Sequence, residues 1–250
     1  MPLGSEEKMD TIGHTTAAQQ RAGGVSALYL GAAFLLAMPF FLVVVDYPGA
    51  TDVAEKVALL AANHASMHVM YLITYVVFGV VLAVLALALH ARLSSAAPAL
   101  MQVATAVGLM WGVVLVASGM VFNAGMAAVV DLYPTNPDQA QSMWQAIEPV
   151  AQGLGSGSGG EFLGGLWILL VSVASLQSRS LPRSLGWLGL AVGLAGLLSI
   201  IPPLSATAYA FGLLLILWFA WLGIAMLRPA AGSPQQAAAA PEVVAATVSR

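Results

Sequence analysis

Two histidines and two tyrosines follow one another near the start of a long apolar stretch. They occur at spacings of four, three and four residues: His64, His68, Tyr71 and Tyr75. Side chains at these spacings share one face of an α-helix. Two imidazoles one turn apart could bind Zn²⁺ or Cu, with acidic outer loops supplying oxygen ligands. The pattern is equally typical of a polar face at a membrane boundary, where both residue types have an apolar and a wet end.

One acidic residue stands at the beginning of another apolar stretch. Glu161 follows the glycine-rich run 153–160 and precedes Phe162. A carboxylate in the first turn of a helix is stabilised by the helix dipole. We therefore expect Glu161 either to anchor a helix start at the water boundary, or to contact a cation or substrate beneath a mobile glycine loop. The run is not a phosphate loop, because no Gly-Lys-Ser or Gly-Lys-Thr follows it.

The rest of the composition limits which metal sites and cofactors the chain can hold. The chain has no cysteine, which excludes disulfides and thiolate metal sites. His14 and His90 lie outside the apolar stretches or at the opposite membrane face, so no second histidine is available for a bis-histidine haem. No cofactor is predicted beyond Zn or Cu at the histidine pair. No catalytic motif is present, so enzymatic activity is undecided, with nothing in the sequence favouring it.

Hydrophobicity and charge indicate a membrane protein. Of 250 residues, 60% are hydrophobic and 8% are charged, whereas soluble domains carry about 25% charged residues. The formal net charge is −3, without a basic run, which excludes nucleic acid as a partner. A helix needs about 20 apolar residues to cross a bilayer. We therefore predict an all-α fold, a polytopic transmembrane helix bundle with lipid as its principal partner.

Six spans are predicted within a transmembrane domain at 26–228. Their approximate bounds are 27–45, 67–89, 101–126, 162–176, 185–201 and 208–227. The leader 1–25 and the tail 229–250 are expected to be largely disordered and cytoplasmic. Short amphipathic helices are expected in the two long outer loops. One is capped by Asp52 and either lies on the membrane surface or runs into the second span, and the other begins at Asn136–Pro137.

Positive charge sets the expected orientation, because cytoplasmic loops retain lysine and arginine. With both termini inside, only Lys56 lies outside, and these basic residues are cytoplasmic: Lys8, Arg21, Arg92, Arg179, Arg183, Arg228 and Arg250. The outer side then collects the acids Asp46, Asp52, Glu55, Asp131, Asp138, Glu148 and Glu161. We therefore predict that both termini are cytoplasmic.

Small residues mark the predicted packing faces. Helices in lipid associate through close backbone approach and interhelical hydrogen bonds. One stripe is Gly186, Gly189, Gly193 and Gly196, and another is Gly108, Gly112 and Gly119, continued by Asn123. We expect these stripes to pack within the chain, with a homodimer seam as the alternative.

Three short stretches resemble a known family. They are Arg21–Leu30, Glu161–Gly165 and Leu181–Gly189, and they are similar to an uncharacterised bacterial family of small six-helix membrane proteins, of the domain-of-unknown-function type. The resemblance implies a multi-pass protein of the bacterial cytoplasmic membrane. Members often carry a glutamate in the last span, whereas this chain has Trp218–Trp221 there.

Two functional hypotheses follow. The first is a non-enzymatic accessory or assembly subunit whose small-residue faces dock on other membrane subunits or on a second copy. The second is small-molecule, lipid or metal handling at an outer-face site near His64 and His68, with Tyr71, Tyr75 and Glu161 as the ligand face.

Overall fold

Apolar periodicity produces helices throughout the part of the chain that the structure describes. This computed structural model describes residues 5–178 and 180–228, with side chains for 17–155, 157–178 and 180–228. Within those residues there are eight α-helices and no strand: α1 (Ser5–Pro39), α2 (Val53–Tyr71), α3 (Phe78–Leu93), α4 (Pro98–Leu132), α5 (Pro137–Ala151), α6 (Ser158–Ser178), α7 (Arg183–Ser199) and α8 (Thr207–Leu227). Three π-helical turns are η1 (Phe40–Val44), η3 (Leu72–Val77) and η4 (Gln152–Ser156), and two 3₁₀ turns are η2 (Tyr47–Gly49) and η5 (Pro202–Leu204).

The π-helical turns join neighbouring helices into longer ones. Two continuous helical stretches result, Val53–Leu93 and Pro137–Ser178. Together with Ala17–Val44, Pro98–Leu132 and Thr207–Leu227, they make five that are long and apolar enough to cross a membrane, by length and composition. The sixth apolar helix, α7, is shorter, at 17 residues. The predicted all-α, multi-pass architecture is thereby confirmed.

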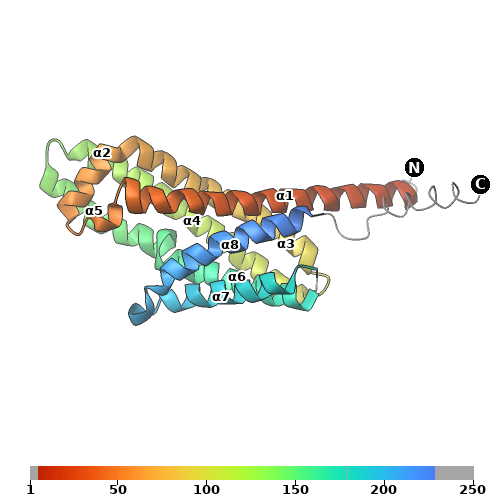
Figure 1. Ribbon diagram of the computed structural model, residues 1–250. Coiled ribbons are helices and arrows are strands. Elements are labelled where there is room, and N and C mark those ends of the chain that lie inside the picture. The colour runs from red at the N-terminus through yellow and green to blue at the C-terminus, as the bar shows by residue number, and fades with distance from the viewer. Residues whose placement is uncertain (1–4, 179, 229–250) are drawn as a thin grey trace, which may run out of the picture.

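The helices run side by side in an elongated bundle with two chemically different ends (Figure 1). α1 lies along α8, α6 along α7, and α2 meets α5 at the end away from the start of α1. We call one end the basic end, because it holds Arg21, Arg92, Arg183 and Arg228. We call the other the acidic end, because it holds Asp46, Asp52, Glu55, Asp131 and Asp138.

Hydrogen bonds tie the basic end together. Gln20 Nε2 donates to the carbonyl oxygen of Met226 at 3.2 Å, and Arg92 Nη2 donates to that of Ser180 at 2.8 Å. Gln20 belongs to the first helix and Met226 to the last, so the chain enters and leaves the bundle on the same side. A chain that crosses the membrane an even number of times has this arrangement. Which side faces the cytoplasm stays a prediction.

The structure differs from the expected leader. α1 is already helical upstream of Ala27, where the sequence indicates disorder. Gly23 and Gly24 lie against α8, and a Cβ atom on Gly24 would be 3.2 Å from the carbonyl oxygen of Gly223. The part of α1 that packs against α8 therefore begins before the predicted first span. The predicted disordered tail at 229–250 lies outside the described residues.

The helix expected after Asp52 runs directly into span 2, which is one of its two expected arrangements. Asp52 caps it as predicted, since its side chain accepts a hydrogen bond from Ala54 N at 3.0 Å. The helix then continues into span 2, with only a local distortion at Asn63 (φ −116°, ψ 16°). Val57 and Leu60 are fully buried against other helices. Packing against protein, in place of lipid, explains the continuity.

The glycine run before Glu161 is helical on both sides of a break at Gly157 (φ −150°, ψ −133°). Residues 152–156 form η4, which packs on α4. A Cβ atom on Gly155 would lie 2.8 Å from the carbonyl oxygen of Val114, so only glycine permits this approach. Ser118 Oγ donates to the carbonyl oxygen of Ala151 at 2.8 Å, which fixes the beginning of the turn.

Candidate functional site

A closed ring of aromatic side chains fills the middle of the bundle. Its members come from α3, α4, α6 and α8 and are Phe78, Trp111, Trp167, Trp218 and Phe219. Consecutive ring centroids are 5.4 to 6.1 Å apart, within the range of favourable aromatic contacts. All five side chains are at most 2% exposed. The ring therefore closes the interior on the side of the basic end.

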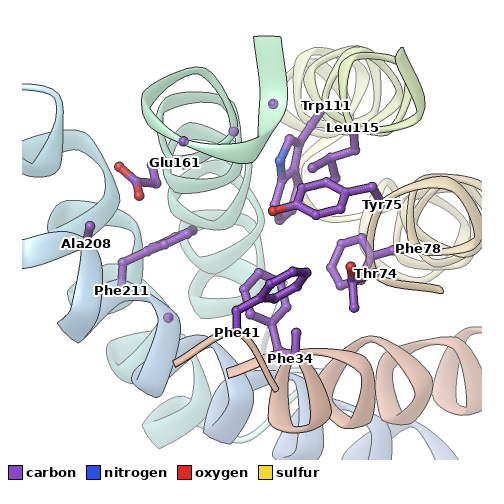
Figure 2. A pocket seen from close by; sticks show the side chains of 15 residues that line it. Phe34, Phe41, Thr74, Tyr75, Phe78, Trp111, Leu115, Glu161, Ala208 and Phe211 are labelled. Atoms are coloured by element: carbon purple, nitrogen blue, oxygen red, sulfur yellow. The ribbon is translucent and has the colours of Figure 1, made fainter. Parts of the chain in front are cut away.

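An inner cavity of about 150 Å³ lies against this ring. Figure 2 shows Trp111 and Tyr75 together on one wall, Phe34 and Phe41 on another, and Glu161 with Phe211 across from them. Most of the lining is apolar and aromatic. A few polar groups in such a setting are typical of small-molecule sites.

A second, open cavity of about 600 Å³ continues the inner one to the flank of the bundle. The two share six lining residues: Phe34, Ala37, Phe41, Glu161, Ala208 and Gly212. The open cavity also reaches Leu42 and Tyr209, which are 39% and 61% exposed. Its mouth lies between α1 and α8, on an apolar flank of the bundle.

Three π-helical turns surround the inner cavity. Phe41 comes from η1, Thr74 and Tyr75 from η3, and Gly155 from η4. π-Helical turns displace side chains from regular helical positions and occur frequently at functional sites. Here Thr74 Oγ1 donates to the carbonyl oxygen of Met70 at 2.7 Å. The helices thus depart from regular α-helical geometry at the residues that line the cavity.

Glu161 is the acidic group of both cavities. Ser199 Oγ donates to Glu161 Oε2 at 2.7 Å. The side chain of Glu161 is half-buried and points toward α7 and α8 (Figure 2). On the facing wall, Trp111 Nε1 is buried and has no hydrogen-bond partner among the described residues. The cavity therefore offers a carboxylate acceptor at Glu161, and Tyr75 contributes a hydroxyl group to the same lining.

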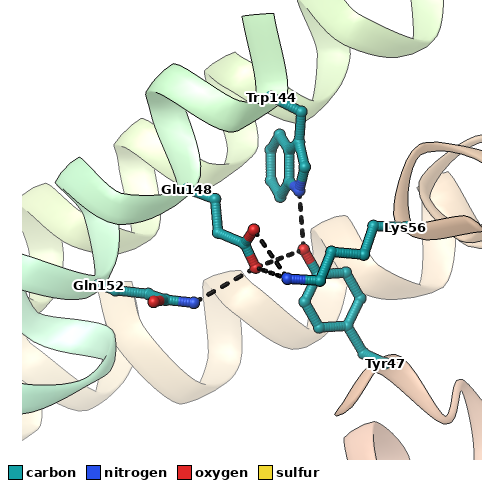
Figure 3. Close-up of polar contacts among 5 residues, drawn as sticks. All are labelled: Tyr47, Lys56, Trp144, Glu148 and Gln152. Carbon is teal, nitrogen blue, oxygen red and sulfur yellow. Dashed lines mark hydrogen bonds and ion pairs between the residues drawn. The ribbon is translucent and has the colours of Figure 1, made fainter. Parts of the chain in front are cut away.

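A network of polar side chains caps the acidic end (Figure 3). Lys56 Nζ contacts both carboxylate oxygens of Glu148 at 2.9 Å. Tyr47 donates its hydroxyl to Glu148 Oε1 at 2.9 Å and accepts from Trp144 Nε1 at 2.8 Å. Gln152 Nε2 donates to Glu148 Oε1 at 3.3 Å. These contacts join η2, α2 and α5.

The cap also bounds a third cavity of about 200 Å³, lined by Phe41, Tyr47, Pro48, Tyr71, Tyr75, Phe122 and Gln152. Phe41 borders all three cavities and Tyr75 borders two. Burial, followed by the neighbouring carboxylate of Glu148, raises the pKa of Tyr47 above its ordinary value of 10.0. The hydroxyl of Tyr47 therefore stays protonated and keeps donating to Glu148.

The structure divides the helical face that begins at His64. The rings of His64 and His68 are 6.3 Å apart between centroids. His64 Nε2 is buried without a partner among the described residues. Those residues contain no group of three or more His, Cys, Asp or Glu side chains that could hold a metal ion. The predicted metal site at His64 and His68 therefore stays a prediction, and the described residues supply no third ligand for it.

Tyr71 and Tyr75 contact different neighbours from those of His64 and His68. Tyr71 stacks on Phe122 with 4.6 Å between ring centroids. Tyr75 and Glu161 line the inner cavity together, whereas His64 and His68 line none of the three cavities. Asn123 is 4% exposed, and its Nδ2 donates to the carbonyl oxygen of His68 at 3.4 Å.

The glycines of both predicted stripes lie against neighbours in the same chain. On α4, Gly108 faces Trp167, Gly119 faces Tyr75, and a Cβ atom on Gly112 would lie 2.7 Å from the carbonyl oxygen of Gly79. The α7 stripe also meets neighbours: Leu176 at Gly186, Ser172 and Trp218 at Gly189, Gly165 and Leu169 at Gly193, and Phe211 at Gly196.

Several site residues carry no chemical signal in the sequence. Phe41, Trp111 and Ser199 look like ordinary members of apolar helices. The pair Lys56 and Glu148 has one signal in the sequence, because Lys56 is the single basic residue that the charge rule places on the outer side. A lone cation among outer acids indicates a specific partner, and that partner is Glu148.

Fold, charge distribution and cavities define a multi-pass α-helical membrane protein with an aromatic interior. The family model described as "Domain of unknown function (DUF4386)" matches residues 24–228, and the chain belongs to this family. The match begins within α1 and ends one residue after α8. It confirms the resemblance to an uncharacterised membrane family. Curated proteins and solved structures give no match to this chain.

Proposed function

We propose that this protein binds a small amphipathic molecule that reaches the inner cavity sideways from the lipid. The observation that carries the proposal is the continuity between the inner and the open cavity, through shared walls at Phe34, Phe41 and Glu161. An apolar ligand in the bilayer would meet the mouth between α1 and α8 without first passing through water.

The chemistry of the walls supports an amphipathic ligand. Aromatic side chains provide apolar surface, while Glu161 offers a carboxylate acceptor and Tyr75 a hydroxyl group. The aromatic ring on the side of the basic end favours binding over passage straight through the bundle.

We place this activity in the cytoplasmic membrane of a bacterium, with the acidic end outside. This localisation rests on the family resemblance and on the distribution of basic residues between the ends. The cap formed by Tyr47, Lys56 and Glu148 then covers the cavities on the outer side.

Photolabelling tests the proposal with an uncharged probe, a diazirine analogue of a medium-chain alcohol, in lipid nanodiscs. We expect adducts on Phe34, Phe41 and Phe211, which line the inner cavity. Ala37→Trp fills space shared by both cavities and should abolish these adducts. Ala128→Trp, on the exposed face of α4, is the matched control. Adducts confined to exposed positions such as Leu35 or Leu213 would overturn the proposal.

An accessory or assembly subunit is a separate proposal. The glycines on which it relied pack within the chain, so docking would need another surface. The exposed apolar flank, which includes Leu35, Val113 and Leu217, suits lipid as well as a partner. Native purification in mild detergent separates the cases, because a subunit would bring a stoichiometric partner protein or a second copy.

A further inference from the structure

We infer that the ligand of the inner cavity carries a positive charge, and that Glu161 binds it. This inference rests on the proposed function and names the class of ligand: an organic cation such as an amine or a quaternary ammonium compound. Three features of the described residues support it, namely the bonding of Glu161, the aromatic walls and the charge of the nearer end of the bundle.

The carboxylate of Glu161 has unused bonding capacity. An ionised carboxylate offers about four lone-pair sites, and Ser199 is its hydrogen-bond partner among the described residues. Within those residues the single salt bridge joins Lys56 to Glu148. Glu161 therefore has no basic side chain within bonding distance there. Ionisable groups within membrane-spanning stretches are costly unless paired, and a cationic ligand would supply the pair.

The walls around Glu161 suit an organic cation better than a bare metal ion. Phe34, Phe41 and Phe211 line the same cavity, and aromatic faces attract ammonium groups within about 6 Å. A hard metal ion needs six or more oxygen ligands. The described residues hold no group of three or more His, Cys, Asp or Glu side chains suited to a metal. A cation with apolar substituents matches both the carboxylate and the rings.

The charge of the two ends favours a cation at this depth. The cavities lie toward the acidic end, where Asp46, Asp52 and Glu55 gather, and the arginines of the described part lie at the other end. One-sided charge raises the local concentration of counter-ions.

Two probes of equal shape test the charge directly: benzyltrimethylammonium and its uncharged carbon isostere neopentylbenzene. Binding to the full chain in nanodiscs is measured by equilibrium dialysis against empty nanodiscs. We expect Glu161→Gln to weaken binding of the cation by about tenfold or more and to leave binding of the isostere unchanged. Glu55→Gln removes the same charge from an exposed acid of the acidic end, and as the matched control it should weaken binding of the cation far less than Glu161→Gln does and leave binding of the isostere unchanged.

A second variant protects the test against misfolding of Glu161→Gln. Ser199→Ala removes the hydroxyl donor but keeps the charge, so the preference for the cation should persist. Equal binding of both probes to the wild type, unaffected by Glu161→Gln, would overturn the inference and leave the cavity proposal standing. Binding of neither probe, together with diazirine adducts only at exposed positions, would overturn both.

Discussion

Lys56 Nζ lies 2.9 Å from each carboxylate oxygen of Glu148 and so fastens the first turn of α2 to the end of α5. The side chains of this pair are 25% and 11% exposed, and Tyr47 and Gln152 add hydrogen bonds to the same carboxylate. The cap over the cavities thus depends on one carboxylate with three partners.

Removing the ammonium group should destabilise the cap. Breaking a buried pair costs about 3–5 kcal/mol, and the partial exposure of Lys56 lowers our expectation for Lys56→Met to about 2 kcal/mol. The free energy of unfolding in mixed micelles measures this. The double variant with Glu148→Gln should lose less than the sum of the single losses. Strict additivity would show that the pair is not coupled, and Glu55→Gln serves as the control.

Tyr47 should make the protein sensitive to alkaline pH. Because its pKa is raised in the folded state, folding keeps a proton that the unfolded chain releases above a pH of about 10. Stability from Tyr47 is therefore complete below that pH and is lost as the pH rises further. Thermal unfolding between about pH 8 and pH 11 should show a smaller alkaline loss in Tyr47→Phe than in the wild type. If Tyr133→Phe reduced the alkaline loss of stability equally, the effect would not be specific to Tyr47.

Gly112 should tolerate no side chain. Its Cβ position lies 2.7 Å from the carbonyl oxygen of Gly79, so Gly112→Ala must push α3 and α4 apart, and overpacking of this kind costs about 1–3 kcal/mol. Gly212→Ala is the matched control, because nothing lies within 4 Å of its Cβ position. There the better helix propensity of alanine, about 1 kcal/mol, should leave stability equal or higher. Equal losses in both variants would contradict the close approach of the two helices.

The pair His64 and His68 should bind zinc only weakly. Two imidazoles fill half of a tetrahedral shell, and the described residues provide no group of three suited to a metal. We expect Zn²⁺ added to the purified protein to be removed by dialysis, as measured by elemental analysis. Stoichiometric metal that survives dialysis, and disappears in a His64→Ala, His68→Ala variant, would instead support a metal centre.

The apolar stretches could be predicted because each is long enough to be recognised alone. Where the helices begin could not always be predicted in this way. The packed part of α1 begins before the predicted span, where Gln20 donates to Met226, which is 206 residues away. The continuity of α2 depends on the burial of Leu60 against other helices. Local patterns carry no information about such partners.

The candidate site was predictable only where residue type gave a signal. Tyr75 and Glu161 stand out as polar residues beside apolar stretches, and the structure brings them to one cavity. Phe41 and Trp111 have the composition of any membrane helix, and their role arises from π-helical turns and from the packing of four helices. Tertiary packing sets those features, so the sequence showed the acid but not the cavity.

The orientation of the bundle can be tested because the chain has no cysteine. Single-cysteine variants Thr135→Cys and Ser95→Cys place an exposed thiol at the acidic end and at the basic end, respectively. Basic loops stay in the cytoplasm, so a membrane-impermeant maleimide should label Thr135→Cys in intact cells. Ser95→Cys should be labelled only after permeabilisation. The reverse pattern would place the cap and the acidic end in the cytoplasm and would contradict the predicted orientation.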